Sequence, residues 1–167
     1  LSRRGADTHK WAPKAVVERH APDTQRTICS LREGGLVYEV PVKAFSQLNP
    51  DVPESLRGTL AAIAHPASIA HFKKLGVAAV ELMPVTAWID ERHLGPHQLT
   101  NAWGYNPVAF MALDPRLAPG GISDLRLVAD TLHAEGITLL LDVVFNHSGE
   151  SDTGGPVLSM RGIDNAL

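Results

Sequence analysis

Three short apolar runs, separated by segments of helical periodicity, constrain the fold of this 167-residue chain more than any other feature. The runs are LVYEVPV at 36–42, VAAVELMPV at 77–85 and ITLLLDVVFN at 137–146. Nearly continuous apolar character over so short a length is typical of strands in a parallel sheet whose two faces are both covered. The pattern therefore predicts an α/β fold.

The segments between the runs predict two helices that each pack through one face. The first is expected to start at Pro66 and to end at the C-cap Gly76, and the second to start at the N-cap Ser123 and to end at Gly136. Apolar side chains recur three or four residues apart in both segments. They are Ile69, Phe72 and Leu75 in the first and Leu125, Val128, Ala129 and Leu132 in the second.

Two completions of this β-α-β-α-β order are open, a doubly wound sheet and a (β/α)8 TIM barrel. No G-x-G-x-x-G follows any of the three runs, so a dinucleotide-binding sheet is unsupported. A barrel needs roughly 250 residues for its eight units, and this chain would supply the first three of them. The connection at 86–122 is long enough to be functional or partly structured.

The chain divides near residue 36. Residues 1–35 are polar and irregular, and we expect them to be the tail of a preceding module with its linker, while 36–167 carry the βα units. Position 1 is Leu and the final GIDNAL shows no helix end or tail. We therefore expect the chain to be a piece of a longer protein.

Charge and cysteine content narrow the class of protein. The formal net charge is −3, from 15 basic and 18 acidic residues, and neither sign forms a run of five, so we expect no nucleic-acid partner. We expect no membrane association either, since there is no apolar stretch of about 18 residues and no signal-peptide core. Cys29 is the only cysteine, which excludes an internal disulfide and favours a reducing, cytoplasmic location.

Each apolar run carries one acidic residue: Glu39, Glu81 and Asp142. We interpret Glu39 and Glu81, in mid-strand, as structural carboxylates in buried ion pairs, because an unpaired buried carboxylate is costly. Asp142 is followed closely by Asn146 and His147. Because barrels place their chemistry at the carboxyl ends of the strands, this group is interpreted as part of a site.

Alternation along the third run predicts which side chains face the barrel axis. Asp142 and Asn146 are expected on the axis side, and the other face is expected to pack on helices through Leu139, Leu141, Val143 and Phe145. A metal held by Asp142, Asn146 and His147 alone is not expected, because Asn with Asp suits a hard cation such as calcium whereas His suits zinc.

The long connection contains NAWGYNP at 101–107, with Trp103 and Tyr105 around a glycine. Aromatic rings on a polar loop over a barrel mouth can stack on the apolar face of a sugar. For Trp103, anchoring of the loop to the core is an equally good interpretation.

Together, VELMPV, NAWGYNP and LLLDVVFNH resemble the first part of the α-amylase superfamily of glycoside hydrolases. With LSMRGIDNAL at 158–167, the combination is similar to glycogen-debranching enzymes of the glycogen operon and isoamylase type. The resemblance covers residues 36–167 and implies the first three strands of a TIM barrel. It also implies that 1–35 is the end of an N-terminal β-sandwich module and that the location is the bacterial cytoplasm.

The resemblance implies a role for each residue at the end of the third strand. His147 would hydrogen-bond the glucose unit beside the cleaved bond, and Tyr105 would stack on the same ring. Asp142 would be a structural carboxylate of the site. Asn146 matches a calcium-binding position of many α-amylases that debranching relatives often lack. It is therefore a weak candidate for a calcium ligand, and we expect no other metal and no cofactor.

Two departures from the family pattern stand out. Pro41 lies where a central strand needs a backbone donor, so we expect a local bulge at the first strand. The superfamily's nucleophile, its general acid/base and a third acid come from the fourth, fifth and seventh strands, and this chain would end after the third. We therefore assign no catalytic residue here.

The resemblance leads us to expect hydrolysis of α-1,6 branch linkages in glycogen or limit dextrin by the parent protein, with retention, and no activity of this chain alone. The expected partner is an α-glucan, including maltooligosaccharide. A branching or trehalose-releasing relative is the alternative within the enzyme class. A non-catalytic carbohydrate-binding or assembly module is the alternative outside it, and exposed barrel edges would favour self-association.

Overall fold

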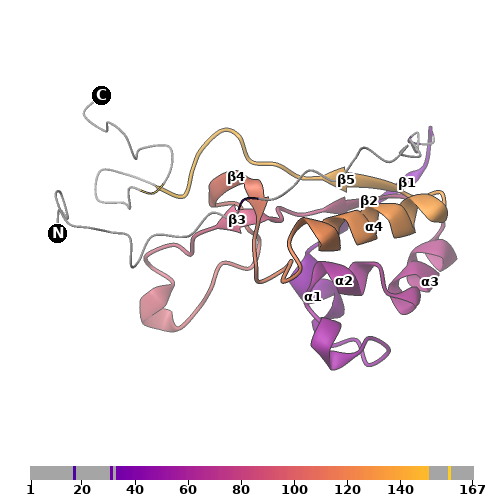
Figure 1. Ribbon diagram of the computed structural model, residues 1–167, viewed down its shortest axis with the longest axis horizontal. Coiled ribbons are helices and arrows are strands. Elements are labelled where there is room, and N and C mark those ends of the chain that lie inside the picture. Colours follow the sequence, from indigo (N-terminus) through magenta and orange to yellow (C-terminus); the bar gives the residue numbers. More distant parts are fainter. Residues whose placement is uncertain (1–16, 18–30, 32, 151–157, 159–167) are drawn as a thin grey trace.

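The computed structural model describes residues 17, 31, 33–150 and 158, so the tail expected at 1–35 lies almost entirely outside the described residues. Its centre is a parallel three-stranded sheet in the order β1-β2-β5 (Figure 1). The strands are β1 (Leu36–Val40), β2 (Val77–Leu82) and β5 (Thr138–Leu141). The register pairs Glu39 with Glu81, and Glu81 with Leu140. The three apolar runs are thus neighbouring parallel strands, as predicted.

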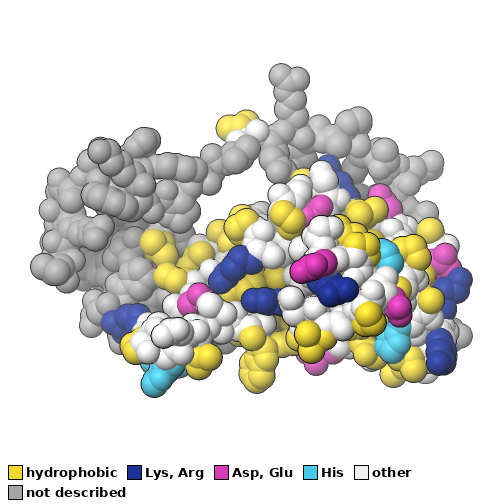
Figure 2. Space-filling view, turned by 90° about the horizontal axis from the view of Figure 1, so that it is seen from below, with side chains coloured by type: hydrophobic (Ala, Val, Ile, Leu, Met, Phe, Trp, Pro, Cys, Tyr) yellow, Lys and Arg dark blue, Asp and Glu magenta, His cyan; other side chains and the backbone are white. Residues whose placement is uncertain are grey.

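Helices cover one side of this sheet (Figure 1). They are α1 (Val42–Gln47), η1 (Glu54–Leu56), α2 (Leu60–Ile63) and α3 (Pro66–Leu75) between β1 and β2, and α4 (Ile122–Ala134) before β5. The core between sheet and helices is apolar, and its fully buried members include Leu60, Ile63, Phe72, Val80, Leu82, Val128 and Leu132. On the side of the molecule seen in Figure 2, basic and acidic side chains are interspersed.

The ends of α3 are as predicted. Pro66 lies in the first turn, where a missing N–H costs no helical bond. Gly76 follows the helix with φ 71°, and its N–H donates to the carbonyl of Lys73 at 3.0 Å. Glycine suits this position because it adopts the left-handed conformation without a steric penalty. Gly136, after α4, has the same φ of 71°.

The prediction of Ser123 as the N-cap of α4 is wrong. The cap is Gly121, with φ 64° and ψ −141°, and Ser123 lies inside the first turn. The carboxylate of Asp124 accepts the N–H of Gly120 at 2.7 Å. The helix therefore begins after Gly120 and Gly121, with the Asp124 carboxylate as the hydrogen-bond acceptor in place of a serine hydroxyl cap.

Pro41 does not bulge β1. The strand ends at Val40, and Pro41 is the residue that precedes α1, where its missing N–H costs nothing. Its carbonyl accepts the N–H of Phe45 at 2.9 Å. The one register shift between β1 and β2 lies instead between Leu36 and Val37.

The third strand is shorter than predicted, and its outer face is not covered. β5 ends at Leu141, and the exposed fractions of Leu141, Val143 and Phe145 are 41%, 45% and 69%. Leu139 packs against the core. The expectation that all four pack on helices is therefore wrong, because no helix within 33–150 follows β5 to cover them.

The long connection is partly structured, as predicted. It contains β3 (Thr86–Trp88), the short helix η2 (Gly95–His97) and β4 (Pro107–Leu113), and β3 pairs with β4 in an antiparallel ladder. It leaves β2 at its carboxyl end. No helix within the described ranges has both the length and the apolar character needed to cross a lipid bilayer.

Candidate functional site

Three residues singled out from the sequence meet beyond the carboxyl ends of β2 and β5. Asp142 directly follows β5, and its N–H extends the sheet by donating to the carbonyl of Leu82 at 2.9 Å. The Tyr105 hydroxyl, from the long connection, donates to the Asp142 carboxylate. His147 Nε2 lies 2.8 Å from the carbonyl oxygen of Tyr105. The fold thus brings a phenol, a carboxylate and an imidazole into one contact network.

Asp142 holds the Tyr105 hydroxyl in its protonated form. The hydrogen bond to Asp142, then burial and the negative charges of Asp142, Glu39 and Glu81, raise the pKa of Tyr105 from 10.0 to about 12. Each cause disfavours the phenolate: it could not donate a hydrogen bond to Asp142, burial would reduce its solvation, and its charge would face the carboxylates. At neutral pH, Tyr105 is therefore a neutral donor whose ring direction is fixed through its hydroxyl.

The contact to Tyr105 assigns the tautomer of neutral His147. A backbone carbonyl only accepts hydrogen bonds, so Nε2 carries the proton. Nδ1 is then an acceptor, and the His147 side chain is exposed. The site consequently offers an aromatic ring and a nearby acceptor for hydroxyl groups.

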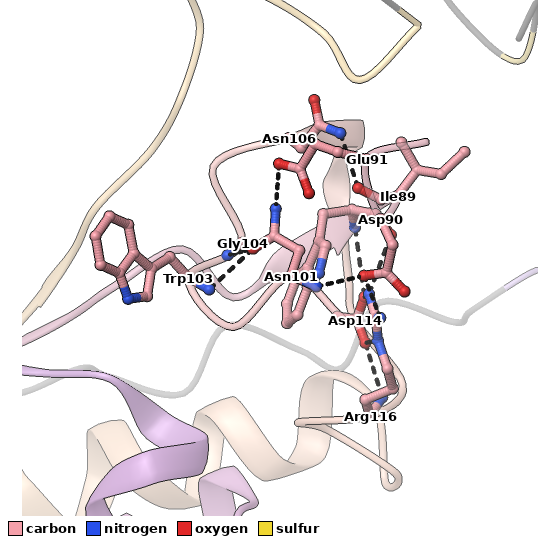
Figure 3. Close-up of polar contacts among 10 residues, drawn as sticks. Ile89, Asp90, Glu91, Asn101, Trp103, Gly104, Asn106, Asp114 and Arg116 are labelled. Carbon is pink, nitrogen blue, oxygen red and sulfur yellow. Dashed lines mark hydrogen bonds and ion pairs between the residues drawn. The ribbon is translucent and has the colours of Figure 1, made fainter. Parts of the chain in front are cut away.

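A tight turn at 101–104 presents Tyr105. The side-chain oxygen of Asn101 accepts the N–H groups of Trp103 at 2.9 Å and of Gly104 at 2.8 Å (Figure 3). Gly104 has φ 80°, and a Cβ added there would lie 2.7 Å from the carbonyl oxygen of Pro84. Only glycine allows the loop to pass this close to the end of β2.

An ion cluster fixes the base of the same loop. Arg116 lies 2.7 Å from Asp114 and 3.2 Å from Asp90, and its guanidinium stacks 4.2 Å from the ring centre of Trp88. Asp114 is almost fully buried, so its attraction to Arg116 is weakly screened. Sequence reasoning missed this cluster, because the contact between Asp90 and Arg116 joins positions 26 residues apart. It also missed Asn101, although an asparagine that caps the N–H groups two and three residues on is a local turn signal that could have found it.

Asn146 is not part of the network. It is exposed, and no hydrogen bond joins it to another residue of 33–150. Within the described residues, His, Cys, Asp and Glu side chains do not gather in groups of three or more that could hold a metal ion. The carboxylate of Asp142, four residues before Asn146, is engaged by Tyr105.

The expectation of buried ion pairs at Glu39 and Glu81 is wrong. Glu39 is exposed and Glu81 is half-buried, and neither forms an ion pair with another residue of 33–150. Neither residue is fully buried, so neither carboxylate requires a buried partner. Their charges act on Tyr105 through space.

Trp103 does not anchor the loop in the core, because 67% of it is exposed. Together with Pro84 and Arg116 it lines a cavity of ≈ 80 Å³, well below the roughly 300 Å³ at which small-ligand pockets begin. The interpretation of Trp103 as an anchor in the core is therefore wrong, and its ring lies at the surface.

Parallel strands with polar groups gathered at their carboxyl ends are typical of α/β enzyme folds, in which both TIM barrels and doubly wound sheets place their sites at this edge. The family model described as alpha amylase, catalytic domain, matches residues 23–153. The chain belongs to the alpha-amylase family, and its α/β sheet is part of that family's barrel.

Curated relatives extend this finding. A glycogen debranching enzyme of Klebsiella pneumoniae is 49% identical over 133 residues, and one of Yersinia pseudotuberculosis is 54% identical over 136 residues. Each alignment covers 78% of this chain and 20% of the relative. The chain thus spans about a fifth of the length of these relatives.

Solved structures show the same fold. The type I pullulanase of Bacillus subtilis, crystallised with maltose, is 29% identical with a TM-score of 0.64, over 80% of this chain and 21% of the pullulanase. The catalytic module of the pneumococcal glycogen-degrading factor SpuA is 26% identical with a TM-score of 0.58, over 74% of this chain and 19% of that module.

Proposed function

We propose that this chain is the first part of the catalytic barrel of a glycogen debranching enzyme. The enzyme would hydrolyse α-1,6-glucosidic branch linkages in glycogen or limit dextrin with retention of configuration. The observation that carries the proposal is the meeting of Tyr105, Asp142 and His147 at the carboxyl ends of the strands. The name shared by relatives 49% and 54% identical to this chain supports it.

The proposal includes the place of the chain in the longer protein. The sheet β1-β2-β5 would be the first three of eight barrel strands, and residues 1–35 the end of a β-sandwich module. The lone cysteine, Cys29, fits the reducing cytoplasm of a bacterium.

The site would bind one glucose unit of an α-glucan. The ring of Tyr105 would stack on the apolar face of the sugar, while its hydroxyl stays on Asp142. Nδ1 of His147 would accept a hydrogen bond from a hydroxyl of the same glucose, because Nε2 is engaged by the backbone. Asp142 acts as scaffold, and the binding requires no metal or cofactor.

Bond cleavage would belong to acids outside this chain. A retaining glycosidase needs two carboxylates about 5–5.5 Å apart, one as nucleophile and one as acid/base. Asp142 is engaged by Tyr105, while Glu39 and Glu81 are register partners, each one residue before the last of its strand, and the family's acids are expected from later strands. None of the three is assigned a covalent or proton-transfer step.

Product analysis tests the proposal. The full-length protein, incubated with glycogen limit dextrin, is expected to release linear maltooligosaccharides, and the chain 1–167 alone is expected to release none. Hydrolysis by the isolated chain would contradict the placement of the acids. Transfer of glucan chains, or release of trehalose, would favour the branching or trehalose-forming alternatives, and binding without turnover would favour a carbohydrate-binding module.

A further inference from the structure

We propose that Asn101 is the positioning residue for Tyr105, acting through the turn at 101–104. The identity of the positioned ligand, a glucan, rests on the proposed function. The positioning itself rests on geometry and can be tested without any sugar.

Asn101 makes four hydrogen bonds with both ends of its amide and with its backbone. Its Oδ1 caps the turn by accepting two backbone N–H groups, those of Trp103 and Gly104. Its Nδ2 donates to Glu91 Oε1 at 2.8 Å, and its backbone N–H donates to Asp90 Oδ1 at 3.0 Å. Ser offers no amide donor and Asp offers none either, so this set of partners requires the amide of asparagine.

The partners of Asn101 are themselves held. Asp90 lies 3.2 Å from Arg116, which lies 2.7 Å from the buried Asp114 at the end of β4. Figure 3 shows Asp90 between Arg116 on one side and Asn101 on the other. The turn is therefore tied to the antiparallel pair β3-β4, a structured part of the connection.

The contact with Glu91 is important because the Glu91 carboxylate has few other hydrogen-bond donors. Its second oxygen, Oε2, is buried and has no hydrogen-bond partner among the described residues. A carboxylate left with neither oxygen bonded would cost more than the bond itself contributes. The hydrogen bond between Asn101 and Glu91 therefore stabilises the positions of both side chains.

The turn leaves Tyr105 little freedom. On its N-terminal side, the backbone of Gly104 is bonded to Asn101. On its C-terminal side, Asn106 donates its amide to the carbonyl of Ile89 at 2.8 Å, and its backbone carbonyl accepts the N–H of Ile89 at 3.1 Å. With both neighbours fixed, the phenol is directed at Asp142, and loss of Asn101 releases one of the two sides.

The readout is the ionised fraction of Tyr105. The chain has two tyrosines, Tyr38 and Tyr105, so a Tyr38→Phe background isolates the second. With a pKa of about 12, Tyr105 is roughly a tenth ionised near pH 11. In Asn101→Ala, the loosened contact with Asp142 is expected to raise this fraction several-fold, as measured by phenolate absorbance. Circular dichroism at the same pH verifies that the chain is folded.

A matched control separates the positioning of Tyr105 from the general effect of losing an asparagine-capped turn. Asn49 makes a similar bond in another loop, since its Oδ1 accepts the N–H of Asp51 at 2.9 Å. Asn49→Ala is expected to leave the ionised fraction of Tyr105 unchanged. If Asn49→Ala and Asn101→Ala raise it equally, the proposal is wrong.

Two variants of Glu91 distinguish the effect of its hydrogen bond from the effect of its charge. They also replace Asn101→Ala as a test if that variant does not fold. Glu91→Ala removes the acceptor and is expected to raise the ionised fraction, whereas Glu91→Gln keeps an acceptor for Asn101 and is expected to leave it near the original value. If alkali unfolds the chain, the ¹³Cζ shift of Tyr105 at neutral pH, referenced to Asp142→Ala, replaces the absorbance. No change of Tyr105 in Asn101→Ala and Glu91→Ala overturns the proposal, whatever the full-length protein does to glycogen.

Discussion

Gly104 illustrates how much a single residue decides at this site. Its φ of 80° is one reason for glycine, and the Pro84 carbonyl oxygen, which would lie 2.7 Å from an added Cβ, is a separate one. Gly76 shares the first reason alone, because its φ is 71° and a Cβ there would meet nothing within 4 Å. The pair therefore separates backbone strain from steric contact.

Alanine at either glycine is expected to cost about 1–2 kcal/mol of unfolding free energy for the left-handed backbone. Gly104→Ala is expected to cost more than Gly76→Ala, because the loop must also move away from β2. Denaturant unfolding of both variants measures the difference. Equal losses would show that the close approach to Pro84 is unimportant.

At the scale of secondary-structure elements, the sequence predicts what depends on local periodicity. The three strands, α3 with Pro66 and Gly76, and their parallel order follow from apolar spacing and end signals. The end of β5 and the role of Pro41 do not, because each depends on what the neighbouring element offers. β5 stops where no strand on its outer side pairs with it within 33–150, and Pro41 stands at a strand-to-helix junction.

The outer side of β5 leads to a prediction about association. Leu141, Val143 and Phe145 are exposed, and Phe145 packs edge-on against Phe110 with ring centres 5.6 Å apart. An apolar surface beside an open strand edge favours pairing between copies. The chain 1–167 is expected to self-associate in sedimentation velocity, and Val143→Ser with Phe145→Ser is expected to weaken this.

Leu48→Ser supplies the matched control for that experiment. Leu48 is 90% exposed but is the C-cap of α1 and belongs to no strand. The Leu48→Ser variant is expected to leave the association unchanged. The role of Leu141, Val143 and Phe145 in association would be refuted if the chain stayed monomeric at all concentrations. It would also be refuted if Leu48→Ser weakened the association as strongly as the double variant.

At the scale of the whole molecule, the site combines residues that the sequence can reveal with residues that it cannot. Tyr105, Asp142 and His147 stand in recognisable motifs, and the fold brings all three together. Asp90 also holds the loop that carries Tyr105, through contacts with Asn101 and Arg116 that connect distant positions and have no sequence signature. Positioning groups of this kind become visible only when the chain is folded.

The contact proposed between this cluster and the glucan during hydrolysis of its branch is tested most directly by kcat/KM of the full-length protein on limit dextrin. His147→Ala is expected to lose about 2–4 kcal/mol of transition-state stabilisation, a decrease of about 30- to 1,000-fold. His97→Ala, an exposed histidine of η2, is the control and is expected to change little. A kcat/KM that His147→Ala leaves at the wild-type value would contradict the account.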